Sequence, residues 1–497
     1  MKRNKLRLIS ISILLFLALL LLNFGSTTLN SGASTDILPV EMDMSLNYTD
    51  SGPITIDSND DFGVSGYGFP GTGTPGDPYL IKELRIVTAA DRAIDVVGVT
   101  VSFTIEDCYL DANFYGIRVD AESAGQVIVI NNTIVGNTRE GLYILRPDGV
   151  QIRNNTFSGN GLMDIRMSFS DSTIIANNTF ISSERAIAAD NNLFLTIENN
   201  TFTETGIYIF NEYYDYAGHT IRNNFVNGKP LGYYTDISDV TIAGGGYGQL
   251  IIANSDNVTI RDHHIDHASI GILCQVLTNS LITNNTLEYN KYAGLFLRWC
   301  SNLIVDSNDF SYSSLGTGIY NSVSSHVVFS NNQIHDNYDG AYNINCNNIT
   351  YFNNTLENMA SYGLRMQSNQ EATILNNTLI NAGRAILLWS FQECNVTYNL
   401  IKDCGGEGIN IDYGSEYNVI HHNFFINNNG GTDQAFSNDV NNLFYDIETS
   451  VGNYWSDYSG TGDYLIGGSA GLTDPNVIVD NTQPSIMDKS VDLIYIV

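Results

Sequence analysis

Apolar and polar residues recur along this chain in a short phrase that returns every 22 to 24 residues. Each copy has an apolar residue, a spacer, two polar residues that are usually Asn-Asn, another spacer and a second apolar residue. The second polar residue, called the marker here, occurs thirteen times, at Asn132, Asn155, Asn178, Asn200, Asn224, His263, Asn285, Asn308, Asn332, Asn354, Asn377, Asn399 and Asn423. A fixed period of this length indicates a stacked repeat.

Two apolar columns accompany the marker. The first lies three positions before it and runs from Val129 and Ile152 to Ile420, and the second lies two positions after it and runs from Ile134 and Phe157 to Phe425. Both columns are rich in β-branched and aromatic residues, which favour pleated strands. A third strand follows about nine residues after the marker and usually opens with glycine, as in Gly141-Leu-Tyr-Ile and Gly363-Leu-Arg-Met.

Such short strands cannot bury their apolar faces singly, whereas stacked coils can. The sequence therefore predicts an all-β fold, a single-stranded right-handed parallel β-helix (pectin-lyase-like solenoid) of about 13 to 15 coils with terminal caps. Asparagine tolerates the left-handed backbone of the bends, and stacked copies can bond amide to amide. Leucine-rich repeats of similar length would need a leucine consensus and helical spacing, and neither is present after residue 50.

The single 39-residue step, between Asn224 and His263, fits one coil plus a partial extra coil. It contains Gly244-Gly-Gly-Tyr-Gly248, so we expect a loop or bulge to project there. Insertions on one face of a repeat array often form its binding face.

The N-terminus has the pattern of an export signal. Residues 1–33 combine four basic residues, an apolar run from Leu8 to Phe24 and small residues near Ser31, which is typical of a signal peptide, with an uncleaved membrane anchor as the alternative. We divide the chain into this leader (1–33), a linker (34–52), a parallel β-helix that includes an N-terminal cap (53–450) and a C-terminal capping segment (451–497). The expected location is extracellular or at the cell surface.

The net charge limits the binding partners to be expected, and the cysteine spacing limits the expected metal sites and disulfides. The formal net charge of −31 makes nucleic acid an improbable partner and leaves solubility or cation binding as its consequences. The six cysteines form no CxxC motif, and most are expected to fill the core. Cys394 and Cys404 could close a loop within one coil, but spacing alone does not establish a disulfide.

Three phrases carry a family resemblance. They are the lead-in Gly71-Thr-Gly-Thr-Pro-Gly-Asp-Pro-Tyr-Leu-Ile81, the interruption Asn227-Gly-Lys-Pro-Leu231, and the tail Gly452-Asn-Tyr-Trp-Ser-Asp-Tyr458. In this order, over residues 53 to 468, they resemble the NosD-like family of right-handed parallel β-helix proteins. The resemblance implies an exported, pectin-lyase-like superhelix of the kind found in carbohydrate-binding proteins and sugar hydrolases. It does not imply one activity, since the founding members are associated with copper supply and other relatives resemble surface proteins.

No cofactor is expected with certainty, and calcium and copper have only limited support. After Tyr458 the family pattern has an Asp-rich segment that resembles a calcium loop, but here only Asp457 and Asp463 remain close together, whereas calcium takes six to eight oxygen ligands. Copper sites draw on Met, Cys and His close in sequence. The one concentration of histidines is Asp262-His-His-Ile-Asp-His267, where His264 and His267 are the candidate metal ligands beside the structural His263.

Acids and imidazoles gather just after the marker. Consecutive coils carry Asp266, Glu288, Ser311, His335 and Glu357 three positions after it, and His267, Tyr289, Tyr312 and Asp336 one position later. If these columns stay in register, they form one patch in which Asp266, Glu288, His335, Asp336 and Glu357 are candidate catalytic residues. We expect Asp266 and Glu288 to repel each other and thereby to raise one pKa, as acid catalysis requires. The alternative is a solvated turn.

A second outward column lies two positions after the glycine of the third strand. We expect an exposed row of aromatic and arginine side chains there, formed by Arg118, Tyr143, Arg166, Tyr208, Phe296, Tyr320, Tyr342 and Arg365. Planar rings at regular spacing suit the apolar faces of sugars. The alternative is that aromatic residues simply favour sheets.

Three functions remain open at this point. The leading one is an exported or cell-surface protein that binds a glycan or serves as a surface scaffold without catalysis. The first alternative is a polysaccharide lyase or glycoside hydrolase that uses the carboxylate patch, and the second is a NosD-like periplasmic copper-delivery accessory. The partner is expected to be a polysaccharide or a cell-surface glycan. The sequence names neither the ligand nor the oligomeric state.

Overall fold

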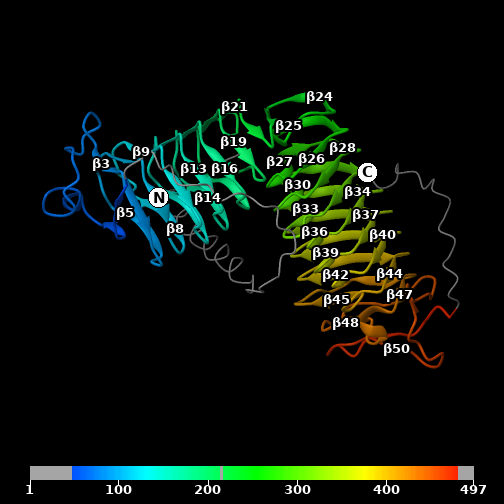
Figure 1. The fold of residues 1–497 in the computed structure, drawn as a ribbon. Helices are drawn as coiled ribbons and strands as arrows, with labels where there is room; N and C mark the ends of the chain where they lie inside the picture. Colours follow the sequence, from blue (N-terminus) through cyan, green and yellow to red (C-terminus); the bar gives the residue numbers. More distant parts are fainter. Residues whose placement is uncertain (1–47, 213–215, 480–497) are drawn as a thin grey trace, which may run out of the picture. The chain divides into compact units, whose positions relative to one another are not determined.

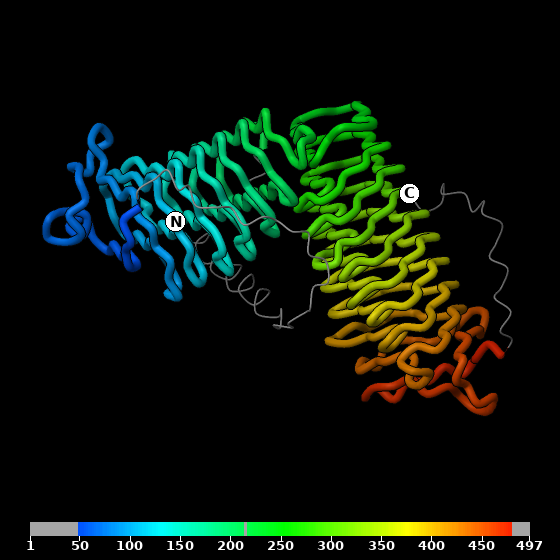
Figure 2. The backbone as a smooth tube through the Cα atoms, in the orientation of Figure 1, coloured from blue at the N-terminus to red at the C-terminus, as the bar shows by residue number. Residues whose placement is uncertain are grey.

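The computed structural model describes residues 48–212 and 216–479, and the predicted leader and the end of the chain lie outside them. Within these ranges the chain is almost wholly β-strand, with two short 3₁₀ turns, η1 (Asn59–Asp61) and η2 (Asn428–Gly431). It forms a parallel β-solenoid of about 15 turns, as predicted. The backbone passes through one coil after another (Figure 2). No helix in the described ranges is long and apolar enough to cross a membrane.

Three parallel sheets form the N-terminal coils, and each coil contributes one strand to each sheet. Sheet one contains β1 (Thr49–Asp50), β4 (Leu84–Val87), β7 (Tyr109–Asp111), β10 (Thr133–Val135), β13 (Thr156–Ser158), β16 (Thr179–Ile181), β19 (Thr201–Thr203) and β22 (Phe225–Val226). Sheet two contains β2 (Ile54–Ile56), β5 (Arg92–Val97), β8 (Tyr115–Asp120), β11 (Glu140–Leu145), β14 (Met163–Ser168), β17 (Arg185–Asp190) and β20 (Ile207–Phe210). Sheet three contains β3 (Tyr79–Lys82), β6 (Phe103–Glu106), β9 (Val127–Ile130), β12 (Gln151–Arg153), β15 (Ile174–Ala176), β18 (Thr196–Glu198) and β21 (Thr220–Arg222).

Two sheets form the later coils (Figure 1). Sheet four contains β23 (Lys229–Thr235), β24 (Ser238–Ala243), β25 (Gln249–Arg261), β27 (Ile270–Thr278), β28 (Leu281–Thr283), β30 (Ala293–Arg298), β31 (Ser301–Asp306), β33 (Thr317–Ser322), β34 (Ser325–Ser330), β36 (Asp339–Ile344), β37 (Asn347–Phe352), β39 (Tyr362–Gln367), β40 (Gln370–Leu375), β42 (Arg384–Trp389), β43 (Gln392–Thr397), β45 (Ile409–Asp412), β46 (Val419–His421) and β48 (Ala435–Ser437). Sheet five contains β26 (His264–Asp266), β29 (Thr286–Glu288), β32 (Asp309–Ser311), β35 (Gln333–His335), β38 (Thr355–Glu357), β41 (Thr378–Ile380), β44 (Leu400–Lys402), β47 (Phe424–Ile426) and β49 (Tyr454–Trp455).

The apolar columns predicted from the repeat form the core. Both columns are buried along their length, except that Ile221 in the first is partly exposed. Aromatic members of the second column stack directly, with ring centroids 5.1 Å apart for Phe157 and Phe180 and 4.9 Å apart for Phe180 and Phe202. Stacking of like residues in neighbouring coils therefore fills the interior.

The marker asparagines form a buried hydrogen-bond ladder. Asn332, for example, is fully buried; its Nδ2 donates to the Val305 carbonyl oxygen at 2.8 Å and to Asn354 Oδ1 at 2.9 Å. The ladder continues beyond the predicted copies, because Asn423 donates to Asn453 and Asn453 donates to Asp474. Asparagine suits this position because its side-chain amide can both donate and accept.

Glycine opens the third strand because the coils approach closely at that point. A Cβ atom at Gly340 would lie 2.5 Å from the carbonyl oxygen of Gly363 in the next coil, and one at Gly318 would lie 2.8 Å from that of Gly340. The repeated glycine thus reflects backbone contact between neighbouring coils rather than a turn.

The long step between markers contains the predicted partial coil. Asn227 and Gly228 both have left-handed backbone angles and reverse the chain, so that β22 and β23 pair antiparallel. The strands β23 and β24 then pair in parallel with β25, and Gly244 to Gly246 form the loop between β24 and β25. Sheet two ends at β20, whereas the pair β22–β23 joins sheets one and four into one 26-stranded sheet.

The ends of the solenoid differ slightly from the predicted boundaries. Thr49 and Asp50, placed in the linker, already pair with β4, and β49 extends sheet five beyond residue 450 by pairing with β47. The C-terminal segment then closes the last coil with the antiparallel pair β50 (Tyr464–Leu465) and β51 (Thr473–Asp474).

A buried carboxyl group in β14 should make stability depend on pH. Asp164 is fully buried, and burial raises its pKa to about 7, although hydrogen bonds from Asn160 and Ser183 and the charge of Lys291 oppose the shift. Because the folded-state pKa lies above the unfolded one, this group's contribution to stability is complete below pH 4 and is lost as the pH rises to about 7. Replacing Asp164 by Asn should therefore stabilise the protein by about 2–4 kcal/mol at pH 8 and by little at pH 4.

Chemical denaturation of wild type and Asp164→Asn at pH 4 and pH 8 measures this difference. The exposed Asp77→Asn is the matched control, and its stability should change equally little at both pH values. A destabilised Asp164→Asn at pH 8 would contradict the prediction.

Candidate functional site

The residues after the marker form a continuous patch on sheet five. Asp266, Glu288, Ser311, His335 and Glu357 are paired in that order in successive strands, as the repeat predicted. The next residue in each coil has a left-handed backbone, with φ of 56° at His267, 55° at Tyr289, 59° at Tyr312 and 56° at Asp336. We call these two columns the carboxylate patch.

A lysine and two histidines contact the acids at the N-terminal end of the carboxylate patch. Lys229 Nζ lies 2.9 Å from Asp266 Oδ1, His267 Nδ1 lies 3.0 Å from Asp266 Oδ2, and His264 Nε2 lies 2.7 Å from Glu288 Oε1. Burial would raise the pKa of Asp266, but hydrogen bonds from Lys229 and His267 outweigh it and hold the pKa below its ordinary value. The rise in one pKa expected for this pair does not occur at Asp266, because the hairpin that carries Lys229 supplies a counter-charge.

Exposed rings stack along the middle of the patch. The ring centroids are 4.8 Å apart for His267 and Tyr289 and 4.7 Å apart for Tyr289 and Tyr312. His335 lies edge-on to Tyr312 and between two acids, with Nε2 3.4 Å from Asp309 Oδ1 and Nδ1 2.8 Å from Asp336 Oδ2. Asp309 was missed by sequence reasoning, although it precedes the apolar Phe310 in the repeat.

The five candidate catalytic residues do not meet at one point. Asp266 and Glu288 lie in neighbouring coils. His335 and Asp336 share one coil, Glu357 lies in the next, and the coil that carries Ser311 separates the two groups. Asp266 and Glu357 are four coils apart, or roughly 19 Å at one strand spacing per coil. The patch is thus a strip with two separate acidic groups rather than one convergent centre.

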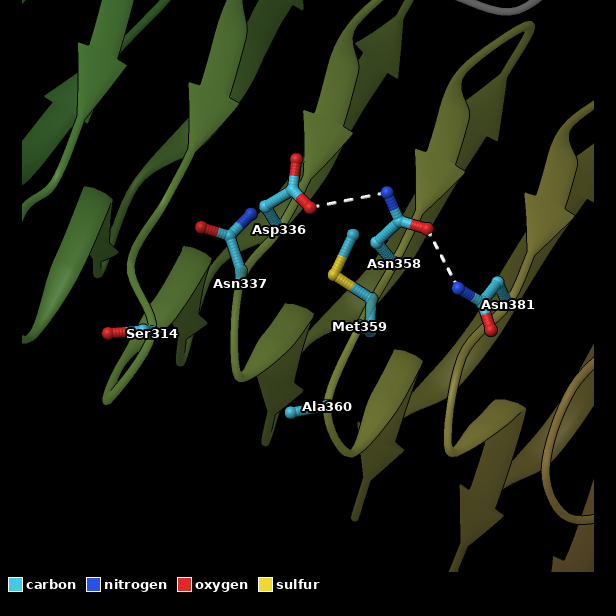
Figure 3. A pocket seen from close by; sticks show the side chains of 7 residues that line it. All are labelled: Ser314, Asp336, Asn337, Asn358, Met359, Ala360 and Asn381. Atoms are coloured by element: carbon cyan, nitrogen blue, oxygen red, sulfur yellow. Dashed lines mark hydrogen bonds between the residues drawn. The ribbon is translucent and has the colours of Figure 1, made fainter. Parts of the chain in front are cut away.

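A shallow depression of about 330 Å³ lies at the second group (Figure 3). It is lined by Ser314, Asp336, Asn337, Asn358, Met359, Ala360 and Asn381. Asn358 Nδ2 donates to Asp336 Oδ1 at 3.2 Å, and Asn381 Nδ2 donates to Asn358 Oδ1 at 2.9 Å. These polar groups bond to one another along three successive coils, so hydrogen bonds between neighbouring coils line the depression.

The described residues contain no group of three or more His, Cys, Asp or Glu side chains placed to hold a metal ion. His264 and His267 contact different carboxylates, Glu288 and Asp266. At the C-terminal cap, Asp457 accepts hydrogen bonds from Gln434 and Tyr464, whereas Asp463 accepts one from Thr473. Sequence reasoning overlooked the adjacent pair His421 and His422, whose Nδ1 atoms lie 2.6 Å apart.

All six cysteines are buried and free, so Cys394 and Cys404 do not form the disulfide considered from their spacing. The two residues belong to different columns, because Cys394 pairs with Ala372 in sheet four, while Cys404 follows β44 in a turn. They act as small core residues, as expected for most cysteines of the chain.

The second predicted column forms a row on the outer face of sheets two and four, interrupted by Ala188 between Arg166 and Tyr208, which we call the aromatic–arginine row. Tyr143 pairs with Arg118 on one side and with Arg166 on the other. In the later coils Phe296, Tyr320, Tyr342 and Arg365 follow one another in register. Tyr208 at the end of sheet two contacts Phe296, with ring centroids 5.5 Å apart, so the row continues across the two sheets.

The expectation that this row is fully exposed is wrong for its central rings. Phe296 is only 1% exposed, Tyr342 7% and Tyr208 8%. Their neighbours cover them, because Arg185 lies 5.8 Å from the ring centroid of Tyr208 and 4.5 Å from that of Tyr292, while Arg365 lies 4.4 Å from that of Tyr342. The row therefore presents ring edges and guanidinium groups more than open ring faces.

Sequence reasoning missed further residues on the face that carries the aromatic–arginine row. Arg185 and Tyr292 lie at the start of the third strand, and Arg298 lies two positions beyond Phe296, over the ring of Phe210 at 4.0 Å. The sequence could have revealed Arg298, because side chains two positions apart along a strand lie on the same face of the sheet. Most of the described arginines gather on this face, although the chain is strongly acidic.

Burial raises the pKa of Tyr143, Tyr320 and Tyr342. Their hydroxyl groups therefore stay protonated at neutral pH and can donate hydrogen bonds. Tyr342 already donates to Gln367 Oε1 at 2.7 Å. Together with the guanidinium groups, these phenols give the face an excess of hydrogen-bond donors.

The stacked coils, the asparagine ladder and the outward rows define a right-handed parallel β-helix protein. The right handed beta helix region family matches residues 92–233 and 227–379, and the family described as periplasmic copper-binding protein (NosD) matches residues 313–460. The chain belongs to the right handed beta helix region family, and its residues 313–460 are similar to the NosD family. No curated protein matches the sequence of the chain.

Several solved structures are similar in fold. The mannuronan C-5 epimerase AlgE4 A-module of Azotobacter vinelandii is 14% identical, with 60% of this chain and 86% of that chain covered and a TM-score of 0.34. The periplasmic alginate epimerase AlgG is 12% identical, with 70% and 78% covered and a TM-score of 0.25. Tailspike protein 3 of bacteriophage CBA120 is 9% identical, with 84% and 67% covered and a TM-score of 0.27. Identities this low do not transfer an activity.

Proposed function

We propose that this chain is an exported glycan-binding protein whose aromatic–arginine row holds an extended polymer. The observation that carries the proposal is the register of the row, because Phe296, Tyr320, Tyr342 and Arg365 occupy the same position in consecutive coils. A repeating surface at one strand spacing, roughly 4.8 Å, suits a ligand that itself repeats. Export is proposed from the predicted leader at residues 1–33.

The chemistry of the row suits sugars. Tyrosine ring edges and partly covered faces can pack against the apolar faces of sugar rings, while phenol and guanidinium groups donate hydrogen bonds to hydroxyl oxygens. The side chains are held by stacking before the ligand arrives, as with Phe296 and Tyr320, whose rings lie 4.8 Å apart. Pre-arranged side chains lose little conformational entropy on binding.

The carboxylate patch supports a second candidate, cleavage of a polysaccharide. One observation favours it, since Asp266 and Glu288 are paired in neighbouring strands, and the reaction uses two carboxylates that flank the scissile bond. Both carboxylates are engaged by Lys229, His264 or His267, which favours binding as the leading function.

Retention of the purified chain on immobilised polysaccharides tests the proposal. Replacing both Tyr143 and Tyr320 by Ala should weaken binding to a retained polymer at least tenfold, because two ring contacts are removed. The matched control is Tyr289→Ala with Tyr312→Ala, which removes two stacked rings from the carboxylate patch and should leave affinity unchanged. Thermal melting of both variants establishes that they fold, and Tyr→Phe substitutions at 143 and 320 should retain most of the affinity.

The reverse pattern, with affinity lost only in the control pair, would move the binding site to the carboxylate patch. Release of reducing or unsaturated ends in the same assay, abolished by Asp266→Asn with Glu288→Gln, would replace binding by cleavage as the function. Retention on none of the polymers would contradict the proposal.

A further inference from the structure

We infer that the polymer is acidic and that Arg298 and Arg365 bind its anionic groups. This inference rests on the proposed function and adds to it the class of ligand and the residues, in and beside the row, that recognise charge. It follows from how the arginines on this face are paired, which differs between the N-terminal and the later coils.

In the N-terminal coils the arginines are neutralised by the chain's own acids. Arg118 Nη2 lies 3.0 Å from Asp120 and its Nη1 lies 3.3 Å from Asp95, while Arg92 also contacts Asp95, at 3.2 Å. Arg166 contacts the buried Glu140 at 3.4 Å. These guanidinium groups hold the face together and have little uncompensated charge to offer a ligand.

Arg298 and Arg365 are paired differently. No carboxylate of the described residues lies within 4.0 Å of either guanidinium group. Arg365 donates only to the neutral Gln367, with Nη2 3.4 Å from Oε1, and Arg298 stacks over Phe210 at 4.0 Å and Trp299 at 4.7 Å. In both side chains Nε is buried without a hydrogen-bond partner among the described residues, as it also is in Arg92 and Arg166, so the absence of a nearby carboxylate is what distinguishes the two.

The nearest acids compensate these charges only in part. Asp190 interacts electrostatically with Arg298, and Asp339 with Arg365, but neither forms an ion pair with it. Burial raises the pKa of both carboxyls, which disfavours their charged forms. Asp339 also accepts a hydrogen bond from the Tyr362 backbone N–H at 3.0 Å.

A partly buried guanidinium group without a counter-charge is costly. The chain has 53 acidic residues against 22 basic ones, so acidic partners are abundant elsewhere. An incoming carboxylate or sulfate would supply the absent counter-charge, and arginine suits both because its planar fork matches pairs of oxygen atoms. Stacking on aromatic rings fixes the orientation of each guanidinium group before the anion arrives.

The two arginines are spaced for a polymer rather than for a small anion. Arg298 lies on β30, two positions beyond the row residue Phe296, and Arg365 lies in the row on β39. They are three coils apart, which is roughly 14 Å along the solenoid at one strand spacing per coil. Tyr320 and Tyr342 occupy the two coils between them. A ligand that contacts both arginines would therefore cross these two rings.

Matched pairs of charged and neutral polymers test the inference with the full chain. The probes are polygalacturonate against its methyl ester, and dextran sulfate against dextran, so that carboxylate and sulfate are distinguished. Wild type should bind at least one charged polymer ten times or more tightly than its neutral counterpart. Arg298→Gln with Arg365→Gln should lose that preference while keeping its affinity for the neutral polymer.

The matched control is Arg153→Gln with Arg222→Gln, which removes two arginines from the outer face of sheet three. It should retain the preference of the wild type. Arg298→Lys with Arg365→Lys keeps the charge without the planar fork and should show an intermediate preference. Thermal melting of each variant confirms folding.

Equal binding of charged and neutral polymers by wild type would overturn the inference and leave the proposed function intact. A preference for charged polymers that survives in the glutamine variant would also overturn it, since the anion would then bind elsewhere. If no polymer is bound at all, the proposed function fails together with the inference.

Discussion

Replacing Trp455 by alanine should lower the free energy of unfolding of the C-terminal coils by about 3–5 kcal/mol, the range for large buried aromatic residues. Trp455 is 2% exposed and stacks between Phe425 and Tyr464, with ring centroids 4.4 Å and 4.3 Å away. Its Nε1 donates to Asp474 Oδ2 at 2.9 Å, so the substitution also removes one donor from a fully buried carboxyl group.

Chemical denaturation measures the loss, and hydrogen exchange should locate it to β47 and the residues that follow, because each coil contacts only its neighbours. Trp389→Ala is the matched control. Trp389 is half-buried on the outer face and stacks at 3.8 Å on Tyr413, which is itself 61% exposed, so its loss should cost only about 1 kcal/mol. Equal losses in the two variants would show that Trp455 does not close the solenoid.

Replacing Asn332 by alanine should destabilise the middle of the solenoid by about 3 kcal/mol, because buried partners are left unsatisfied. Asn332 Oδ1 accepts from the backbone N–H of Asn308 at 2.9 Å and from its Nδ2 at 3.0 Å. Its own Nδ2 donates to Val305 and Asn354. The substitution therefore interrupts the ladder in both directions.

The neighbouring Asn331 provides the control for this variant. It is exposed and has a φ of 54°, which glycine adopts without strain, so Asn331→Gly removes an asparagine without breaking the buried ladder. We expect the thermal midpoint to fall markedly for Asn332→Ala and little for Asn331→Gly. A similar fall in both would show that the buried asparagine ladder adds no more stability than the exposed asparagine beside it.

The fold could be predicted from the sequence because one local phrase is repeated. The apolar positions at Val129 and Ile134 and their counterparts fix which side chains point inward, and the period fixes which residues lie beside each other in the next coil. The register of Asp266 with Glu288, and of Phe296 with Tyr320, followed directly from that period. In a stacked repeat, residues one period apart in the sequence lie side by side in neighbouring coils.

For the candidate sites, the sequence predicted which residues stand in register on the outer face, but not which of them are exposed or paired. Alternation placed Phe296 and Tyr342 on the outer face but could not show that neighbouring rings and arginines bury them. The repeat could not show that Lys229, on a hairpin in the irregular step, would reach Asp266 and neutralise it. Arg298 and Arg365 look like any other arginines of the third strand until their missing acidic partners are seen.

The sequence by itself determined the solenoid, the inner asparagine ladder and the register of the outward columns, because these depend on period and on the backbone spacing of parallel strands. The tertiary structure alone decided which of the outward residues are covered, which charges are compensated and where the ladder ends on Asp474. The physical reason is that burial and ion pairing depend on side chains from other coils and from the irregular segments, which the repeat does not encode.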